Sequence, residues 1–319
     1  MKRLTIISAA LIIPLILCTS WGFFAHQRIN NLAVFTLPTG MISFYKKNIK
    51  YITEYAVDPD KRRYADTLEA PRHYLDAENY EKHIDSIPEK WNDAVAKYGE
   101  KKLNSDGIVP WQIQRTYYSL VKAFENRDSI KILKYSADLG HYIGDAHVPL
   151  HTTSNHNGQL TNQVGIHAFW ESRLPELFHT NYNFVVGKAT YIENPLKEAW
   201  KIVKHTNTLV DTVLRFESQL ASNFPSDKKY SFSERNNTVL KQYSVAYSKA
   251  YHDKMENMVE KQMRSAILKI GSYWFSAWVD AGQPELKNLI KVEPKADEKK
   301  VETETEKKFL KGFPIGREI

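Results

Sequence analysis

The sequence predicts an all-α protein with a single helical domain. Apolar residues recur at helical spacing in four stretches, namely 111–124, 130–144, 195–220 and 237–281. Alternating patterns typical of strands are hard to find, and no repeat of fixed period is visible. The 319 residues are 42% apolar, which is enough to bury a core without disulfides. We therefore expect one domain over residues 21–285.

Residues 1–20 have the pattern of a signal peptide. Two basic residues precede an apolar run from Leu4 to Leu17, which is shorter than the roughly 18 residues of a spanning helix. Small residues up to Ser20 suit a signal peptidase, so we expect a mature chain that begins at Trp21 and is exported, periplasmic or secreted. An uncleaved anchor and lipidation of Cys18 are the alternatives. The only cysteine lies here, which excludes a disulfide framework and a cysteine-based zinc ribbon.

The last segment, residues 286–319, is rich in charge. Lysine, glutamate and threonine alternate over 287–311, with few core-forming residues. Such a segment buries too little apolar surface to offset the entropy lost on ordering. We therefore expect a charged, flexible tail, and a short amphipathic helix is the alternative.

Histidines cluster in the middle of the chain. Five of the eleven lie within 27 residues: His141, His147, His151, His156 and His167. His141 and Asp145 are four residues apart on a predicted helix and therefore share a face. Pro149 should end that helix, which brings His151 back toward the same region from a loop. His167 and Glu171 form a second pair at the same spacing, so the pattern indicates a metal site.

The chemistry of these side chains narrows the choice of metal. Either pair alone is more typical of a surface ion pair, and His147, His156 and His179 could be ordinary loop histidines. Two pairs separated by a His-Pro loop favour metal binding. Imidazole and carboxylate ligands without thiolate suit zinc, with manganese and iron as alternatives.

Together these motifs resemble the superfamily of zinc-dependent phospholipase C and the single-strand-specific zinc nucleases. The resemblance covers most of the chain after residue 20, in order. It begins with Trp21 and His26, continues through motifs at 55–60 and 70–77, and ends with the two histidine–carboxylate pairs. It implies an all-α domain with a cleft that holds three zinc ions.

The resemblance also implies which residues bind zinc. One ion would be held by Asp58, His73, His141 and Asp145, a second by His151, His167 and Glu171, and the third by Trp21, His26 and again Asp145. Trp21 would contribute its amine, whose ordinary pKa of about 7.7 to 8.0 lets a metal displace the proton near neutral pH. Spacing alone leaves other choices open: Asp60 or Asp66 for Asp58, Asp76 for His73, and His147 for His151.

The implied activity is hydrolysis of phosphoric esters by an exported zinc enzyme. Clustered zinc ions activate water and neutralise phosphoryl oxygens. We expect zinc-bound hydroxide to attack phosphorus, with Asp58 as the catalytic residue that ligates zinc and orients or deprotonates the water. The basic run 61–63 could contact phosphate or form a solvated loop. Phe169 and Trp170 could line a substrate pocket or pack in the core.

The substrate is the least determined feature. Glu171 as the closing carboxylate resembles the phospholipase branch, whereas the short spacing from Trp21 to His26 resembles the nuclease branch. We predict a phospholipase C-like hydrolase, with a single-strand-specific nuclease or 3'-nucleotidase as the alternative. A non-catalytic exported zinc-binding protein is the second alternative. The expected partner is a phosphate-ester substrate, phospholipid or single-stranded nucleic acid. Peripheral membrane contact is an option, no protein partner is evident, and a monomer is expected.

The distribution of the net charge of +7 indicates that bound metal, and not the surface of the domain, attracts phosphate. Removal of the charges in 1–20 and 286–319 leaves the domain close to +3. Three zinc ions would add about six positive charges in one cleft. The attraction for phosphate is therefore expected to come from the metal site.

Overall fold

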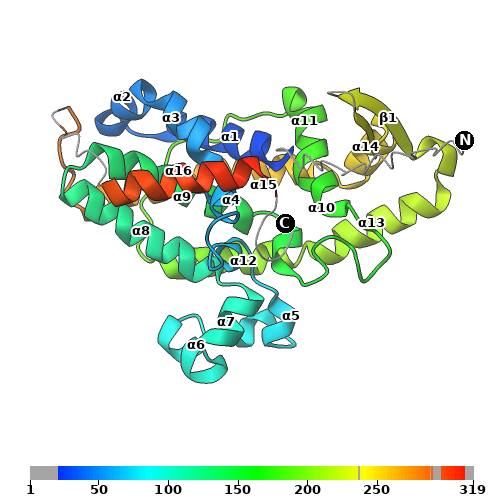
Figure 1. Ribbon diagram of the computed structural model, residues 1–319, viewed down its shortest axis with the longest axis horizontal. Coiled ribbons are helices and arrows are strands. Elements are labelled where there is room, and N and C mark those ends of the chain that lie inside the picture. The colour runs from blue at the N-terminus through cyan, green and yellow to red at the C-terminus, as the bar shows by residue number, and fades with distance from the viewer. Residues whose placement is uncertain (1–20, 236–237, 288, 290–295, 313–319) are drawn as a thin grey trace, which may run out of the picture.

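Three long helices pack against one another at the centre of the protein: α8 (Val109–Glu125), α9 (Ser129–Ala146) and α15 (Met258–Asp280) (Figure 1). The computed structural model describes residues 21–235, 238–287, 289 and 296–312. The predicted signal peptide, residues 1–20, lies outside the described residues. The all-α prediction is confirmed, since the described chain is helical apart from two short strands.

The remaining helices surround this centre. They are α1 (Trp21–Ala33), α2 (Thr39–Lys47), α3 (Ile49–Glu54), α4 (Asp58–Arg62), α5 (Ala77–Tyr80), α6 (Trp91–Tyr98), α7 (Glu100–Asp106), α10 (Ile166–Ala168), α11 (Leu174–Phe178), α12 (Pro195–Asn207), α13 (Val210–Asn223), α14 (Val245–Lys254) and α16 (Ala296–Leu310). Short turns of 3-10 or π-helix connect several of them, among them η3 (Ala70–His73), η5 (Pro149–Thr152) and η6 (Phe169–Arg173).

Helix α9 is almost entirely buried over its second half, and local sequence sets both of its ends. Asp128 caps the first turn, where its side chain accepts a hydrogen bond from the backbone N–H of Lys131 at 3.2 Å. The helix ends at Ala146, three residues before Pro149, as the sequence predicts. The buried half carries His141 and Asp145, so the site lies in the core of the domain.

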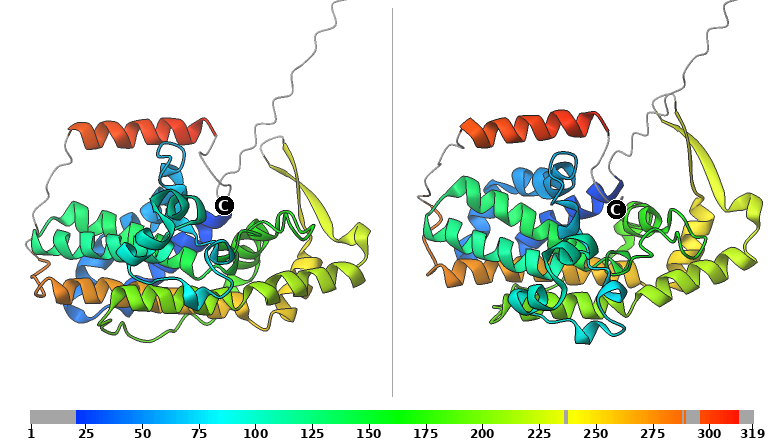
Figure 2. Two further views of the ribbon diagram at one scale, coloured as in Figure 1. Left: turned by 90° about the horizontal axis from the view of Figure 1, so that it is seen from below. Right: turned by 60° about the horizontal axis from the view of Figure 1, so that its bottom comes forward.

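Two predicted helical stretches are interrupted. Residues 195–220 form α12 and α13 with a break between them, and 237–281 contains α14 and α15. The predicted helix over 238–243 is wrong, because this segment is strand β2 (Thr238–Tyr243), paired antiparallel with β1 (Tyr230–Arg235). Its β-branched and aromatic residues suit a strand, and Tyr243 packs on Phe169 with ring centroids 3.9 Å apart. The hairpin projects from the helical body (Figure 2).

Part of the charged C-terminal segment is helical, which is the alternative that the sequence left open. Helix α16 lies along the body and contacts α4 (Figure 2). Phe309 of α16 packs edge-on against Tyr64, with ring centroids 5.1 Å apart, and near Phe23 at 6.1 Å. Lys61 of α4 forms an ion pair with Glu306 of α16 at 3.7 Å.

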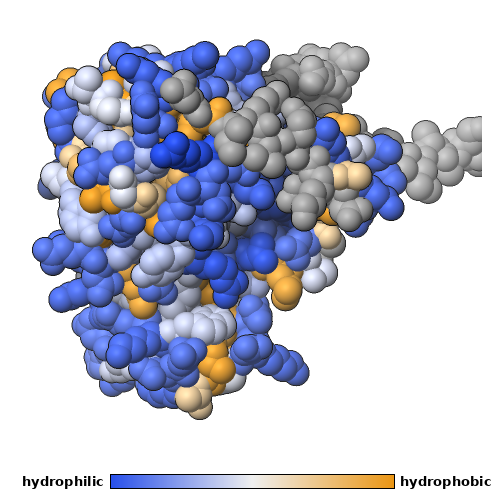
Figure 3. Space-filling view, turned by 90° about the vertical axis from the view of Figure 1, so that its left-hand side faces the viewer, coloured by the Kyte–Doolittle hydropathy of each residue, from blue (hydrophilic) through white to orange (hydrophobic). Residues whose placement is uncertain are grey.

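On the face shown in Figure 3, the described residues are mostly hydrophilic, and the hydrophobic ones lie in small separate patches. Within the described part of the chain, no helix is both long and apolar enough to cross a membrane.

Candidate metal centre

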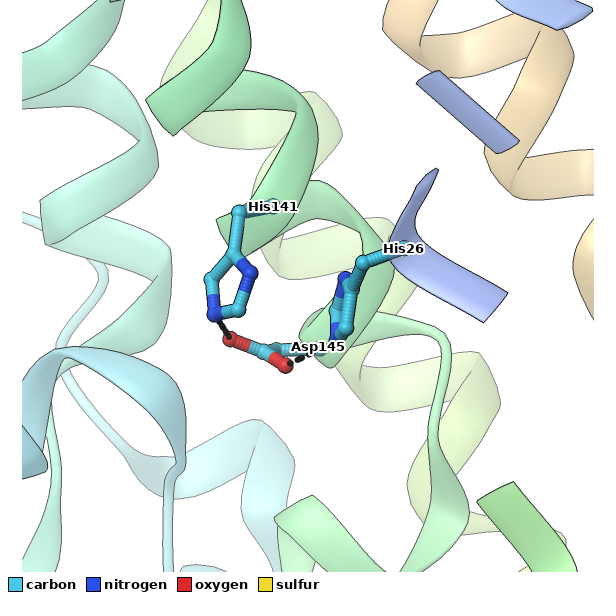
Figure 4. A group of neighbouring side chains, drawn as sticks. All are labelled: His26, His141 and Asp145. Carbon is cyan, nitrogen blue, oxygen red and sulfur yellow. Dashed lines mark ion pairs between the residues drawn. The ribbon is translucent and has the colours of Figure 1, made fainter. Parts of the chain in front are cut away.

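His26, His141 and Asp145 converge in the core between α1 and α9 (Figure 4). Asp145 Oδ2 lies 3.2 Å from His141 Nε2, and Asp145 Oδ1 lies 3.3 Å from His26 Nε2. The two imidazole rings stack with centroids 4.1 Å apart. All three side chains are buried. Asp145 directs one oxygen at His141 and the other at His26.

A second group contains Asp60, His73 and His141. His73 Nδ1 lies 3.0 Å from His141 Nε2, and Asp60 Oδ1 lies 3.7 Å from both of these nitrogens. Asp145 Oδ2 is also 3.0 Å from His73 Nδ1. His141 belongs to both groups, and Asp145 contacts histidines of both, so the two groups form one continuous cluster of donors.

The structure brings Asp60, and not Asp58, to this second group. Both residues lie in the first turn of α4, and positions two apart on a helix are separated by about 200° around its axis. Only one of them can face His73 and His141. Asp58 instead forms an ion pair with Lys61 at 3.4 Å, and no candidate metal group among the described residues includes it. Burial raises the pKa of Asp58 to about 6, although Lys61 opposes that shift.

The third group is His151, His167 and Glu171. Glu171 Oε2 lies 2.8 Å from His167 Nε2 and 3.3 Å from His151 Nε2. Glu171 sits in η6, a π-helical turn between α10 and α11, and such turns are frequent at functional sites. Its other oxygen is 3.3 Å from His26 Nε2. The third group therefore adjoins the first.

Backbone carbonyls determine which ring nitrogen of two histidines is free to bind metal. His141 Nδ1 lies 2.8 Å from the carbonyl oxygen of Ala56, and His151 Nδ1 lies 2.8 Å from that of His73. A carbonyl oxygen can only accept, so both Nδ1 atoms must donate. The Nε2 lone pairs of both rings then point into the cluster, as metal ligation requires.

The charges of the cluster suit a cation. Burial alone would raise the pKa of Asp145 and of Glu171, but neighbouring histidines lower both well below their usual range. Burial alone would lower the pKa of His26, but Asp145 and Glu171 outweigh it and raise that pKa. Ionised carboxylates are thus held among imidazoles in the core. This donor set fits zinc, and protons would compete with the metal for the histidines.

Most of the alternative ligands lie apart from the cluster. Among the described residues, Asp66, Asp76 and His147 belong to no candidate metal group. His147 Nδ1 donates to the carbonyl of Ile143 at 2.7 Å, and its Nε2 is 3.0 Å from Ser265 Oγ. Trp21 begins α1, the helix that carries His26, but its side chain lies outside what the structure describes.

The remaining sequence candidates are largely engaged in packing. Phe169 and Trp170 are both buried: Phe169 stacks on Tyr243, and Trp170 lines a cavity of about 30 Å³ beside His26. In the basic run 61–63, the middle residue, Arg62, contacts buried carboxylates of the core. The run is therefore not a solvated loop.

Sequence reasoning missed one buried residue beside the cluster, Glu69. Its side chain is fully buried, and Oε1 lies 3.6 Å from His73 Nε2. The signal that could have found it is the spacing of four residues between Glu69 and His73, the same spacing as in the two pairs that were recognised.

A helical domain with three adjoining groups of buried histidine and carboxylate donors is typical of metal-dependent hydrolases. A family model described as S1/P1 nuclease matches residues 21–276, and the chain belongs to that family. The family is zinc-dependent and hydrolyses phosphoric ester bonds, which confirms the predicted superfamily and enzyme class. A comparison with curated protein sequences finds no match.

Proposed function

We propose that the protein hydrolyses phosphodiester bonds of single-stranded nucleic acid. The observation that carries this proposal is the match of residues 21–276 to the S1/P1 nuclease family, together with the three donor groups in the core. The proposal departs from the sequence-based preference for phospholipase C. That activity is the second candidate, because the closing carboxylate Glu171 resembles the phospholipase branch.

The three donor groups support a centre for three zinc ions. We assign Asp60, His73, His141 and Asp145 to one ion, and His151, His167 and Glu171 to a second. His26 and Asp145 are assigned to the third, with Trp21 as the family resemblance implies. Asp60 replaces Asp58 in this assignment. Bound zinc supplies Lewis-acid activation of water and neutralises charge on the phosphoryl group. A buried cluster of ionised carboxylates and imidazoles is compatible with such cations.

Asp60 is the ligand candidate best placed to meet substrate. Its side chain is 21% exposed, against 2% for Asp145 and 10% for Glu171. Water and substrate would therefore reach the cluster from the side of Asp60 and helix α4. There, Asp60 would orient the attacking water and accept its proton, the role that the sequence assigned to Asp58. Arg63, 3.9 Å from Asp60, adds a buried positive charge beside that carboxylate.

Parallel assays of one zinc-loaded preparation test this proposal. The substrates are single-stranded DNA and RNA, duplex DNA, a 3'-nucleotide, a short-chain phospholipid and a chromogenic phosphocholine ester. Preferential cleavage of single strands, lost on chelation and restored by zinc, is the expected result. Cleavage of phospholipid alone would establish the second candidate. A zinc-loaded protein inactive on all six would show a non-catalytic zinc-binding protein.

A further inference from the structure

Glu69 contacts His73 on the side of the imidazole ring that faces away from the donor cluster. His73 Nδ1 faces Asp145 and His141, at 3.0 Å from each, whereas Nε2 faces Glu69 Oε1 at 3.6 Å. Both Glu69 and His73 are fully buried. When Nδ1 binds a metal, the ring proton must lie on Nε2, and the carboxylate of Glu69 lies beside that nitrogen.

Glu69 is held in place by three polar side chains. Arg62 Nε donates to Glu69 Oε2 at 3.3 Å, and Arg72 Nη1 donates to the same oxygen. The hydroxyl of Tyr142 donates to Oε1, the oxygen nearest to His73. The positive charges of the two arginines lie beside Oε2 and balance the charge of this buried carboxylate.

From this geometry we propose that Glu69 is a positioning residue for the metal centre. Its carboxylate keeps the proton of His73 on Nε2, and so presents the Nδ1 lone pair to the metal. Carboxylates that accept the free N–H of a ligating histidine fix its tautomer and raise its basicity. The inference rests on the proposed role of His73 as a ligand, and it adds a group that no donor set in the structure contains.

The competing explanation is that Glu69 serves only to neutralise the buried arginines. Asp138 separates the two explanations, because it also pairs with Arg62 but has no hydrogen bond or ion pair with His73 among the contacts of the described residues. Its two carboxylate oxygens each lie 3.1 Å from an amino nitrogen of the Arg62 guanidinium group. Asp138 is also buried, so Asp138→Asn is a matched control for Glu69→Gln.

The experiment measures zinc affinity by competition with a chromogenic chelator, for the full protein and both variants. Glu69→Gln should weaken the zinc site that contains His73 by about 10- to 100-fold. Asp138→Asn should bind zinc like the wild type, even if it unfolds at a lower temperature. Histidine ¹⁵N NMR of the zinc-loaded wild type should show His73 protonated on Nε2, with faster exchange of that proton in Glu69→Gln.

Each outcome bears on a different part of the inference. Equal zinc affinity in the two variants would overturn the positioning role and leave Glu69 as a counter-ion for the arginines. If Glu69→Gln does not fold, Tyr142→Phe decides, because it removes the hydroxyl that holds Oε1 and keeps the carboxylate. If Tyr142→Phe binds zinc more weakly than Asp138→Asn does, the proposal is supported. If Tyr142→Phe binds zinc as tightly as Asp138→Asn does, the proposal is overturned. Absence of zinc binding by the wild type would instead refute the proposed metal centre.

Discussion

Gly144 of α9 lies directly against His26 of α1. A Cβ atom built on Gly144 would be 2.9 Å from His26 Nδ1 and 2.8 Å from the Cδ1 atom of Ile29, closer than real Cβ atoms approach. One turn earlier, a Cβ atom on Gly140 would be 2.1 Å from Oδ1 of Asn30. Two glycines therefore let α1 approach α9 closely enough for His26 to reach Asp145.

Gly144→Ala should displace His26 and weaken the metal site that His26 shares with Asp145. Overpacking of this kind costs about 1 to 3 kcal/mol of the free energy of unfolding. Elemental analysis of the dialysed protein should find less zinc than in the wild type. Gly40→Ala in α2 is the control, because its added Cβ contacts only the ring of Trp278. Wild-type zinc content in Gly144→Ala would refute the role of this contact.

Two variants test whether Asp60, and not Asp58, is the proposed ligand and general base. Asp60→Asn should lower kcat by at least about 100-fold, since it removes a proposed ligand and general base. Asp58→Asn should keep most of the activity and all of the zinc, because Asp58 contacts Lys61 and no donor group. Phosphodiesterase assays and zinc analysis of both proteins give the answer. The reverse ranking would return the catalytic role to Asp58.

His147 makes stability depend on pH. Burial lowers its pKa from 6.5 to about 4, so the folded protein keeps this ring neutral where the unfolded chain already binds a proton. The unfolded state then holds more protons between about pH 6.5 and 4, and stability falls as the pH drops through that window. The loss at full effect is on the order of 3 kcal/mol.

Urea unfolding of the metal-free protein, measured at several values between pH 7.5 and pH 4, reveals this contribution. His147→Gln removes the titrating ring and should flatten the dependence, whatever its stability at neutral pH. The two proteins are compared by the slope of the free energy of unfolding against pH. The contributions of acidic groups that both proteins share then cancel. Identical slopes would show that His147 is not the group responsible.

Helix α16 lies outside the matched residues 21–276 and beside α4, the helix that carries Asp60. Loosening it should open the side of the cluster from which we propose that substrate approaches. Phe309→Ala removes the ring that packs on Tyr64 and should raise kcat/KM for a long single strand severalfold, with little change for a small chromogenic diester. Leu310→Ala is the control, since Leu310 is 74% exposed. Equal effects on both substrates would exclude steric restriction by α16.

The amine of Trp21 gives a prediction about processing. If it is a ligand, residues added before Trp21 should lower the zinc content, because a peptide nitrogen has no free lone pair to offer. The same residues added at the C-terminus serve as the control. Equal zinc contents by elemental analysis would remove Trp21 from the ligand set.

Sequence spacing was sufficient to pair candidate ligands that lie close together along the chain. His141 with Asp145, and His167 with Glu171, are pairs four residues apart, and one helical turn places each pair on one face whatever surrounds it. The end of α9 before Pro149 and the predominantly helical fold follow from the same local rules. The hairpin over 230–243 did not, because a helix-like apolar pattern was overridden by packing of Tyr243 on Phe169.

The sequence by itself thus determined the helical class, the imidazole and carboxylate character of the candidate metal site and the residues paired along one helix, since these depend on periodicity and side-chain type. Tertiary structure alone placed Asp60, and not Asp58, beside His73, because the docking of α4 selects which side of a short helix faces that histidine. It also decided the burial of Glu69 beside that histidine and the docking of α16 on α4. These depend on contacts between segments far apart in the chain, whose geometry local spacing does not contain.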